Sequence, residues 1–119
     1  MDGAFFETWV VLEIYKSYLN HGQRPPLYFY RDQNKKEIDL IIHRDNTVYP
    51  IEIKKGAAPK GATRHFSVLN PIAQEPDEED LFFGVAHLKT EIGTGAVICL
   101  CADALPIDRK NWFVPAWVI

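Results

Sequence analysis

Two short segments with alternating polar and apolar residues, 36–43 and 48–54, most strongly limit the folds that are open to this chain. Their period of two is typical of β-strands with one buried face. Polar residues 44–47 lie between them, so the two strands are predicted to form an antiparallel hairpin. Pro50 lacks an N–H, which predicts a bulge or an unpaired position in the second strand. The aromatic-rich segment 27–30 predicts a further strand before the hairpin.

Helical patterns lie on both sides of the hairpin in the sequence. Residues 3–20 are predicted to form the first helix, with Asp2 as its N-cap and Gly22 as its stop signal. The remaining predicted elements are a helix at 62–69, a polar insertion at 70–80, a segment at 81–88 that favours helix over strand, a buried strand at 96–102 and a final strand or edge at 112–119. Together they predict an α/β fold, with residues 1–119 forming a single domain and helices flanking a mixed sheet.

The hairpin brings two carboxylates together. A two-residue loop at 45–46 sets a register in which Asp39 lies opposite Glu52. Directly opposite Cβ atoms lie about 4.5–5.5 Å apart, so the two carboxylates repel each other unless a positive group lies between them. A divalent cation or the Lys54 ammonium meets this need. The alternative interpretation is a solvated hairpin held by surface ion pairs, such as one between Glu37 and Lys54.

A third carboxylate is expected nearby. Glu7 shares a helical stripe with Val11, Ile14 and Tyr18, and this stripe should face the sheet. A buried carboxylate requires a cation or hydrogen-bond donors. If the first helix packs on the sheet, Glu7 can therefore approach the pair of carboxylates on the hairpin.

Three carboxylates near one point suit Mg²⁺, which prefers oxygen ligands and keeps several of its waters. The predicted cofactor is therefore Mg²⁺ or Mn²⁺, and the predicted chemistry is metal-assisted hydrolysis of a phosphodiester. Lys54 would orient the attacking water or neutralise the negative charge that develops on the phosphate.

These residues resemble the PD-(D/E)XK nuclease superfamily, in which an Asp and an E-x-K follow a helix that bears a Glu. More closely, the chain resembles the nuclease-fold domain of unknown function at the C-terminus of predicted prokaryotic P-loop ATPases of the AAA type. The likeness covers most of the chain and is carried by Gly3, Phe6, Glu7, Val10, Glu13 and Lys16, then by residues 27–31, 37–40 and 50–54, and also by residues 95–100 and 112–115.

The resemblance implies a restriction-endonuclease-like α-β-β-β-α-β core. It implies that Asp39 and Glu52 are metal ligands and that Lys54 is the catalytic lysine. It further implies Glu7 as an accessory ligand, directly or through water, and the backbone carbonyl of Ile53 as the group that completes the shell. The chain has no G-x-x-x-x-G-K-[ST] motif, so the ATPase module is absent and we expect the chain to be the C-terminal part of a larger ATPase.

Basic residues close to the predicted site could contact DNA. Lys55, Lys60 and Arg64, with His65, could line a phosphate-binding edge, and the alternative is a solvated loop and helix face. The net charge of −3 does not favour strong non-specific binding to nucleic acid, and an acidic run at 75–80 would repel DNA if it lay near the groove. Two hypotheses therefore stay open: a Mg²⁺-dependent DNA nuclease, and a catalytically inactive nuclease-fold module for recognition or assembly with a partner ATPase.

Cellular context is constrained by what the sequence contains. Cys99 and Cys101 lie two residues apart in an apolar run, where we expect them to pack as small hydrophobic residues instead of forming a disulfide. No apolar run is long enough to span a membrane and no basic segment resembles a signal peptide, so a cytoplasmic location and no membrane partner are expected. Whether the chain forms a homodimer is left open.

Overall fold

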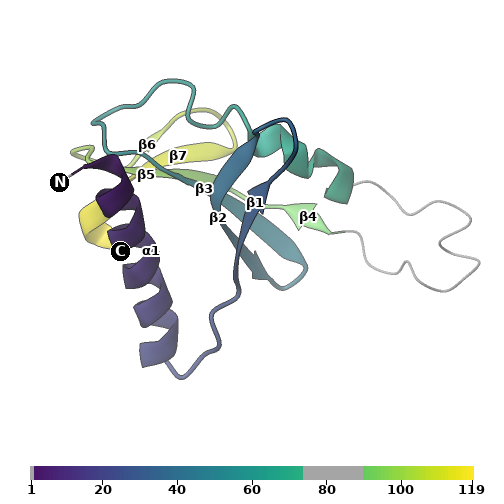
Figure 1. Ribbon diagram of the computed structural model, residues 1–119, viewed down its shortest axis with the longest axis horizontal. Coiled ribbons are helices and arrows are strands. Elements are labelled where there is room, and N and C mark those ends of the chain that lie inside the picture. The colour runs from purple at the N-terminus through teal and green to yellow at the C-terminus, as the bar shows by residue number, and fades with distance from the viewer. Residues whose placement is uncertain (1, 74–89) are drawn as a thin grey trace, which may run out of the picture.

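A mixed sheet forms the centre of the fold in the computed structural model, which describes residues 2–73 and 90–119 (Figure 1). Its strands are β1 (Leu27–Arg31), β2 (Glu37–Arg44), β3 (Thr47–Ile53), β4 (Glu91–Ile92), β5 (Gly95–Cys99), β6 (Leu105–Pro106) and β7 (Asn111–Pro115). They are ordered β1-β2-β3-β5-β7-β6, with β4 also beside β3. β1, β2 and β3 pair antiparallel, whereas β3 pairs parallel with β4 and β5, and β5 with β7. The predicted α/β class with a mixed sheet is therefore confirmed.

Helix α1 (Gly3–Asn20) has the bounds that the sequence predicts. The side chain of Asp2 accepts a hydrogen bond from the backbone N–H of Phe5 at 2.8 Å, which caps the first turn. Gly22 follows the helix at φ 69°, a left-handed conformation that suits glycine, and so ends it.

Helix α1 packs on one face of the sheet through Phe6, Val10 and Ile14. The buried face is therefore rotated slightly from the predicted stripe: Phe6 and Val10 are buried where the sequence predicts Glu7 and Val11. Glu7 and Val11 consequently lie at the edge of the buried face and are only partly buried. The carboxylate of Glu7 faces the border between the core and solvent, where it avoids the full cost of burial.

A short 3-10 helix, η1 (Phe66–Ala73), packs on the other face of the sheet. The helix predicted at 62–69 is therefore wrong in its start and type, because residues 60–65 form turns and Pro71 lies within η1. Phe66 and Leu69 are buried, as predicted. Of the predicted insertion, residues 70–73 belong to η1, and the rest of it lies outside the described residues with the segment predicted at 81–88.

Strand β2 contains a bulge at the candidate site. Tyr28 of β1 pairs with Ile41, and Tyr30 pairs with Ile38, so β2 has one more residue than β1 in this interval. The extra residue is accommodated around Asp39, between these two pairs. Bulges of this kind bend a strand and redirect its side chains, often next to functional sites.

The bulge changes which side chains share a face. Leu40 and Ile42 pack toward α1, whereas Ile38 packs with Ile41 toward η1. The prediction that Ile38, Leu40 and Ile42 share one face is therefore wrong for Ile38. Strict alternation fails here because an inserted residue reverses the side-chain direction of everything beyond it.

Pro50 lies where the parallel neighbour of β3 changes. The backbone N–H of Gly93, which directly follows β4, donates to the carbonyl of Val48 at 2.8 Å, and β5 begins to pair at Ile51. Val48 and Pro50 are two residues apart, so their backbones face the same neighbouring strands. The backbone of Pro50 therefore faces the gap between the end of β4 and the start of β5. No strand pairs with β3 from that side at this position, so the missing N–H of Pro50 costs no hydrogen bond of the sheet.

The C-terminal part contains the predicted buried strand and the predicted last strand. β5 and β7 pair along their whole length, and a 3-10 turn, η2 (Ala116–Val118), follows β7 and lies beside α1 (Figure 1). Cys99 and Cys101 are free and buried, with their Sγ atoms 2.9 Å apart. Burial raises the pKa of the Cys99 thiol to about 11. The two residues thus pack as small hydrophobic residues, as expected.

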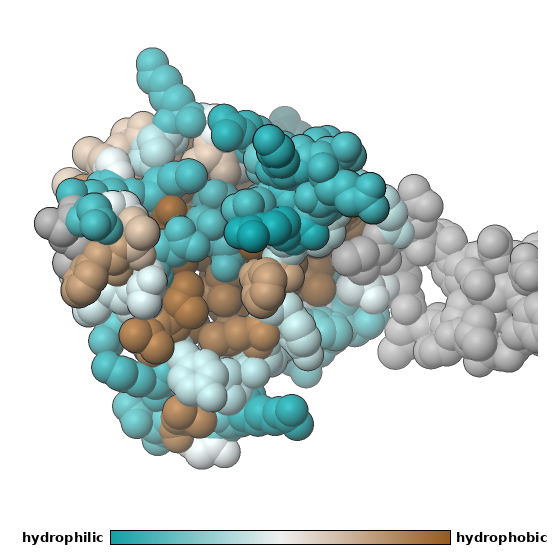
Figure 2. Space-filling model, in the orientation of Figure 1, coloured by the Kyte–Doolittle hydropathy of each residue, from teal (hydrophilic) through white to brown (hydrophobic). Residues whose placement is uncertain are grey.

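Hydrophobic and hydrophilic side chains are separated on the surface. Figure 2 shows hydrophilic residues over the upper part of the viewed face and hydrophobic residues between α1 and the strands β1 and β2. No helix formed by residues 2–73 and 90–119 has the length and apolar character needed to cross a membrane.

Gly95 is predicted to be essential for seating η1 on the sheet. A Cβ at this position would lie 2.8 Å from the Phe66 ring and would also collide with the Asn111 side chain. Phe66 is part of the packed core and cannot move freely, so we expect Gly95→Ala to lower the free energy of unfolding by about 1–3 kcal/mol. Urea unfolding measures this change.

Gly56→Ala is the matched control, because a Cβ there meets only Pro59 atoms at 3.9 Å. We expect this variant to unfold within about 0.5 kcal/mol of the wild type. Equal stability of the two variants would contradict the proposed seating of Phe66.

Candidate active site

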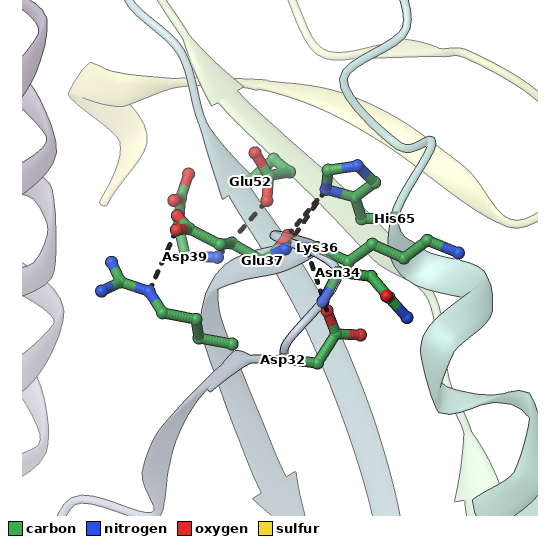
Figure 3. A network of polar contacts seen from close by, with 8 residues as sticks. Asp32, Asn34, Lys36, Glu37, Asp39, Glu52 and His65 are labelled. Atoms are coloured by element: carbon green, nitrogen blue, oxygen red, sulfur yellow. Dashed lines mark hydrogen bonds and ion pairs between the residues drawn. The ribbon is translucent and has the colours of Figure 1, made fainter.

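The site lies where β2 and β3 stop pairing. Their ladder runs from Arg44–Thr47 to Leu40–Ile51, which is the predicted register. Beyond this point the side chains of Asp39 and Glu52 replace the backbone partners, within the network of polar contacts shown in Figure 3.

Asp39 and Glu52 exchange side-chain to backbone hydrogen bonds across the hairpin. Asp39 Oδ2 accepts from the backbone N–H of Ile53 at 2.9 Å, and Glu52 Oε1 accepts from the backbone N–H of Asp39 at 3.3 Å. One oxygen of each carboxylate is therefore fixed by the main chain. The structure thus brings together the two residues that the sequence placed opposite each other.

Glu52 is a buried carboxyl group with an exposed fraction of 6%. Burial raises its pKa to about 8, and the negative charge of Asp39 contributes to the increase. Lys54 offsets this only in part, since its Nζ lies 3.8 Å from Glu52 Oε2 and its side chain is 50% exposed. The pair of carboxyl groups therefore retains a proton near neutral pH unless a cation replaces it.

Glu7 faces this pair from helix α1. Burial raises the pKa of Glu7, and the charge and hydrogen bonding of the Asp39 carboxylate raise it further, while Lys54 lowers it. Glu7 therefore interacts with the Asp39 carboxylate. The carboxyl groups of Glu7 and Asp39 therefore repel each other when both are ionised.

The carbonyl of Ile53 points toward the same region. The N–H of Ile53 faces Asp39, whereas the N–H of Lys54 turns away and donates to the carbonyl of Ile98 at 3.0 Å. In an extended strand the N–H and C=O of one residue point to the same side. The Ile53 oxygen is therefore directed to the side of the hairpin on which Asp39 lies.

A cleft of about 400 Å³ opens over the two carboxylates. It is lined by Lys35, Glu37, Asp39, Glu52, Lys54, Pro59, Lys60, Gly61, Ala62, Arg64 and His65. Its floor is acidic and its rim, drawn from three separate segments, is mostly basic. Such an arrangement suits a ligand that is negatively charged and also brings or shares a cation.

Glu37 has other partners than the sequence suggests. Its Oε1 lies 3.0 Å from Arg31 Nε, and its backbone lies 3.3 Å from His65 Nδ1. Lys54 instead approaches Glu52. The alternative hairpin, with an ion pair between Glu37 and Lys54, is therefore not what the fold contains.

The three basic residues that the sequence predicts to contact DNA lie in two separate hollows. Lys60 and Arg64 line the cleft, whereas Lys55 lines a separate apolar hollow with Trp9 and Trp117. β3 ends at Ile53 and the chain bends from Lys55 onward, so the two consecutive lysines line different hollows.

Lys35 lines the cleft, although the sequence patterns do not single it out. It occupies a turn at φ 61°, and Asp32 Oδ1 holds that turn by accepting from the backbone N–H groups of Asn34 and Lys36. A basic residue in a tight turn that leads into the strand of Asp39 is the signal that could have revealed it.

Comparison with known proteins identifies the sequence family of the chain. A family described as a domain of unknown function, DUF4143, matches residues 2–119. The chain belongs to DUF4143. No curated protein and no solved structure matches it. The match to DUF4143 begins at the N-cap of α1 and includes every candidate site residue, so the whole cleft is part of the family's domain.

The donor set fits a hard divalent cation that keeps much of its water. In the described part of the chain, residues 2–73 and 90–119, no three His, Cys, Asp or Glu side chains are grouped as a ready-made metal shell. Mg²⁺ does not need one, because it commonly binds through one or two carboxylates and several waters. Asp39, Glu52 and the Ile53 carbonyl could supply such a set. The expected grouping of Glu7 with these two carboxylates in one metal shell is not found among the described residues.

We predict that the metal-free protein loses stability as the pH rises from about 5 to about 8. The pKa of Glu52 is about 8 in the folded protein, above the ordinary value of 4.5 that the unfolded chain keeps. Over this range the folded chain therefore holds a proton that the unfolded chain has released. The loss is at most about 1.4 kcal/mol per pH unit. Urea unfolding in the presence of EDTA at several pH values measures it.

Glu52→Gln should flatten this dependence, because an amide does not titrate. Glu91→Gln, which changes an exposed residue of β4, is the matched control and should keep the wild-type slope. Identical slopes in all three proteins would show that Glu52 does not hold the proton.

Proposed function

We propose that this DUF4143 domain hydrolyses phosphodiester bonds in DNA with the help of Mg²⁺ or Mn²⁺. The observation that carries the proposal is the pair of carboxylates, Asp39 and Glu52, fixed at one point beside Lys54 at the floor of a basic-rimmed cleft. The order of these residues, behind a helix that bears Glu7, resembles the PD-(D/E)XK nucleases and supports the same chemistry.

Asp39, Glu52 and the Ile53 carbonyl would hold the cation, with Glu7 as an accessory ligand. When bound, such a cation lowers the pKa of a coordinated water and stabilises negative charge on a phosphate. The protein contributes the fixed orientation of the ligands, since a backbone N–H holds one oxygen of each carboxylate. The remaining oxygens, Asp39 Oδ1 and Glu52 Oε2, are then presented in defined positions.

Lys54 is suited to act on the reacting phosphate. Its ammonium group reaches within 3.8 Å of Glu52 Oε2, yet half of its side chain is exposed to the cleft. It can therefore orient an attacking water or neutralise charge that develops on the phosphate oxygens. Lys35, Lys60 and Arg64 would hold the DNA backbone through its phosphates.

The local charge of the cleft offsets the acidity of the whole chain. The formal net charge is −3, which alone would weaken binding to nucleic acid. The basic side chains nevertheless gather at the rim of one cleft, so a phosphate backbone would meet positive charge first.

A second candidate is a catalytically inactive nuclease-fold module that serves recognition or assembly with an AAA-type ATPase. It is favoured by the contacts that Asp39 and Glu52 already make, because each carboxylate satisfies a backbone N–H where the strands separate. In this case the pair would stabilise the hairpin and the retained proton would replace a metal.

We predict metal-dependent cleavage that requires Asp39. Nicking of supercoiled plasmid and of branched DNA is measured with Mg²⁺ or Mn²⁺, and with EDTA. Asp39→Asn and Glu52→Gln should reduce the rate to background, and Lys54→Ala should reduce it by at least about 100-fold. Glu91→Gln is the control and should cut at the wild-type rate.

Calorimetric titration with Mn²⁺ separates the two candidates. Binding that Asp39→Asn abolishes, together with cleavage, supports the nuclease. Absence of both metal binding and cleavage in the folded wild type would leave the inactive module as the function of this cleft.

We predict that the cleft rim sets DNA affinity. Replacing Lys60 and Arg64 by Ala should weaken DNA binding about 5- to 10-fold and reduce the salt dependence of log K by about 2, one for each lost phosphate contact. Fluorescence anisotropy at several salt concentrations measures both quantities. Lys55→Ala, in the separate hollow, is the control and should leave them unchanged.

A further inference from the structure

Helix α1 has a second apolar face that no part of the described chain covers. Phe5, Trp9, Leu12, Tyr15 and Leu19 are exposed, with exposed fractions between 38% and 62%. On a helix with about 3.6 residues per turn these five side chains fall within an arc of about 120°. They form one continuous face, which we call the outer face of α1.

The outer face lies opposite the face that packs on the sheet through Phe6, Val10 and Ile14. A surface helix normally presents polar residues to solvent, and a helix that is apolar all round is normally buried. Within the arc of the outer face only Thr8 and Lys16 are polar. The composition of this face is therefore typical of an interface.

The outer face is symmetric about its centre, Leu12. Phe5 and Leu19 lie equally far from Leu12 in opposite directions along the helix, and Trp9 and Tyr15 do so as well. An antiparallel two-fold pairing centred on Leu12 would bring apolar side chains together in reciprocal contacts, because each residue i that contacts j on the partner implies the reverse contact. An unrelated partner imposes no symmetry on the surface that it covers.

We propose that two copies of this chain pair through the outer faces of α1, antiparallel and with the two-fold axis at Leu12. In this pairing Leu12 meets the partner's Leu12 and Phe5 meets the partner's Leu19. Trp9 meets the partner's Tyr15, an aromatic contact that adds to the burial of apolar surface.

The charges within the outer face are compatible with this pairing. Lys16, which forms an exposed ion pair with Glu13 at 3.4 Å, lies as far from Leu12 as Thr8 does on the other side. Each Lys16 would therefore meet the partner's Thr8, not a second ammonium. Its position beside the partner's Trp9 would also allow a cation–π contact.

The exposed area is sufficient for a specific dimer. The aromatic side chains carry roughly 150–250 Å² each, so with the two leucines, and at the exposed fractions above, the outer face leaves on the order of 500 Å² uncovered on each chain. Pairing two copies would bury about 1,000 Å², the lower limit for a specific interface. Trp117 extends this surface further. It is 59% exposed and, together with Trp9, lines a hollow of about 320 Å³.

Sedimentation velocity of the 119-residue chain over a range of concentrations tests the pairing. We expect a dimer that dissociates on dilution. Leu12→Glu places two carboxylates at the two-fold axis and should raise the dimer Kd by at least about 100-fold. Leu105→Glu, at a leucine of β6 that is 54% exposed, is the matched control and should dimerise as the wild type does. Circular dichroism verifies that each variant is folded.

Cross-linking tests the position of the axis. Leu12→Cys should form an intermolecular disulfide under mild oxidation, because a residue on a two-fold axis meets its own copy. Leu105→Cys should not, and the native Cys99 and Cys101 are buried and should not react. A wild type that stays monomeric, or a dimer that Leu12→Glu leaves intact, would overturn the proposal.

Discussion

The candidate site depends on one interruption of backbone pairing. β2 and β3 form a regular ladder up to Leu40 and Ile51, and a bulge in β2 then lets the strands separate. The carboxylates of Asp39 and Glu52 satisfy backbone N–H groups that would otherwise lose their partners. Two acidic side chains are thereby held close together, and the raised pKa of Glu52 reflects the cost of its burial first and of its repulsion from Asp39 second.

The rest of the fold stabilises this unfavourable arrangement. α1 and η1 cover opposite faces of the sheet, so Glu52 is buried and Glu7 is brought toward Asp39. The turns between β3 and η1 carry basic side chains over the acidic floor. Acidic side chains at the floor and basic side chains at the rim are arranged in the order in which a metal-bound phosphate would need them.

The amino-acid sequence is sufficient to predict the hairpin register and α1, because alternation, polar turns and capping residues are local signals. It cannot predict the bulge, since an inserted residue is visible only against the neighbouring strand, and Ile38 is expected on the wrong face as a result. The partner of Glu37 escapes prediction for a related reason: Arg31 comes from β1, and only the register of β1 on β2 makes them neighbours. Lys55 is expected in the cleft because proximity in the sequence does not show where β3 ends and the chain bends, and it is this bend, from Lys55 onward, that follows Lys54.

The adjacent thiols of Cys99 and Cys101 bear on which metal ions the chain can select. Ions such as Zn²⁺ and Cu⁺ bind to thiolates, and two neighbouring cysteines, one at the end of β5 and one just after it, could have attracted them. Because burial raises the pKa of Cys99 to about 11, its sulfur stays protonated at neutral pH and is a poor ligand. The Cys99 thiol is therefore a weak competitor for any cation that the oxygen atoms of the cleft would hold.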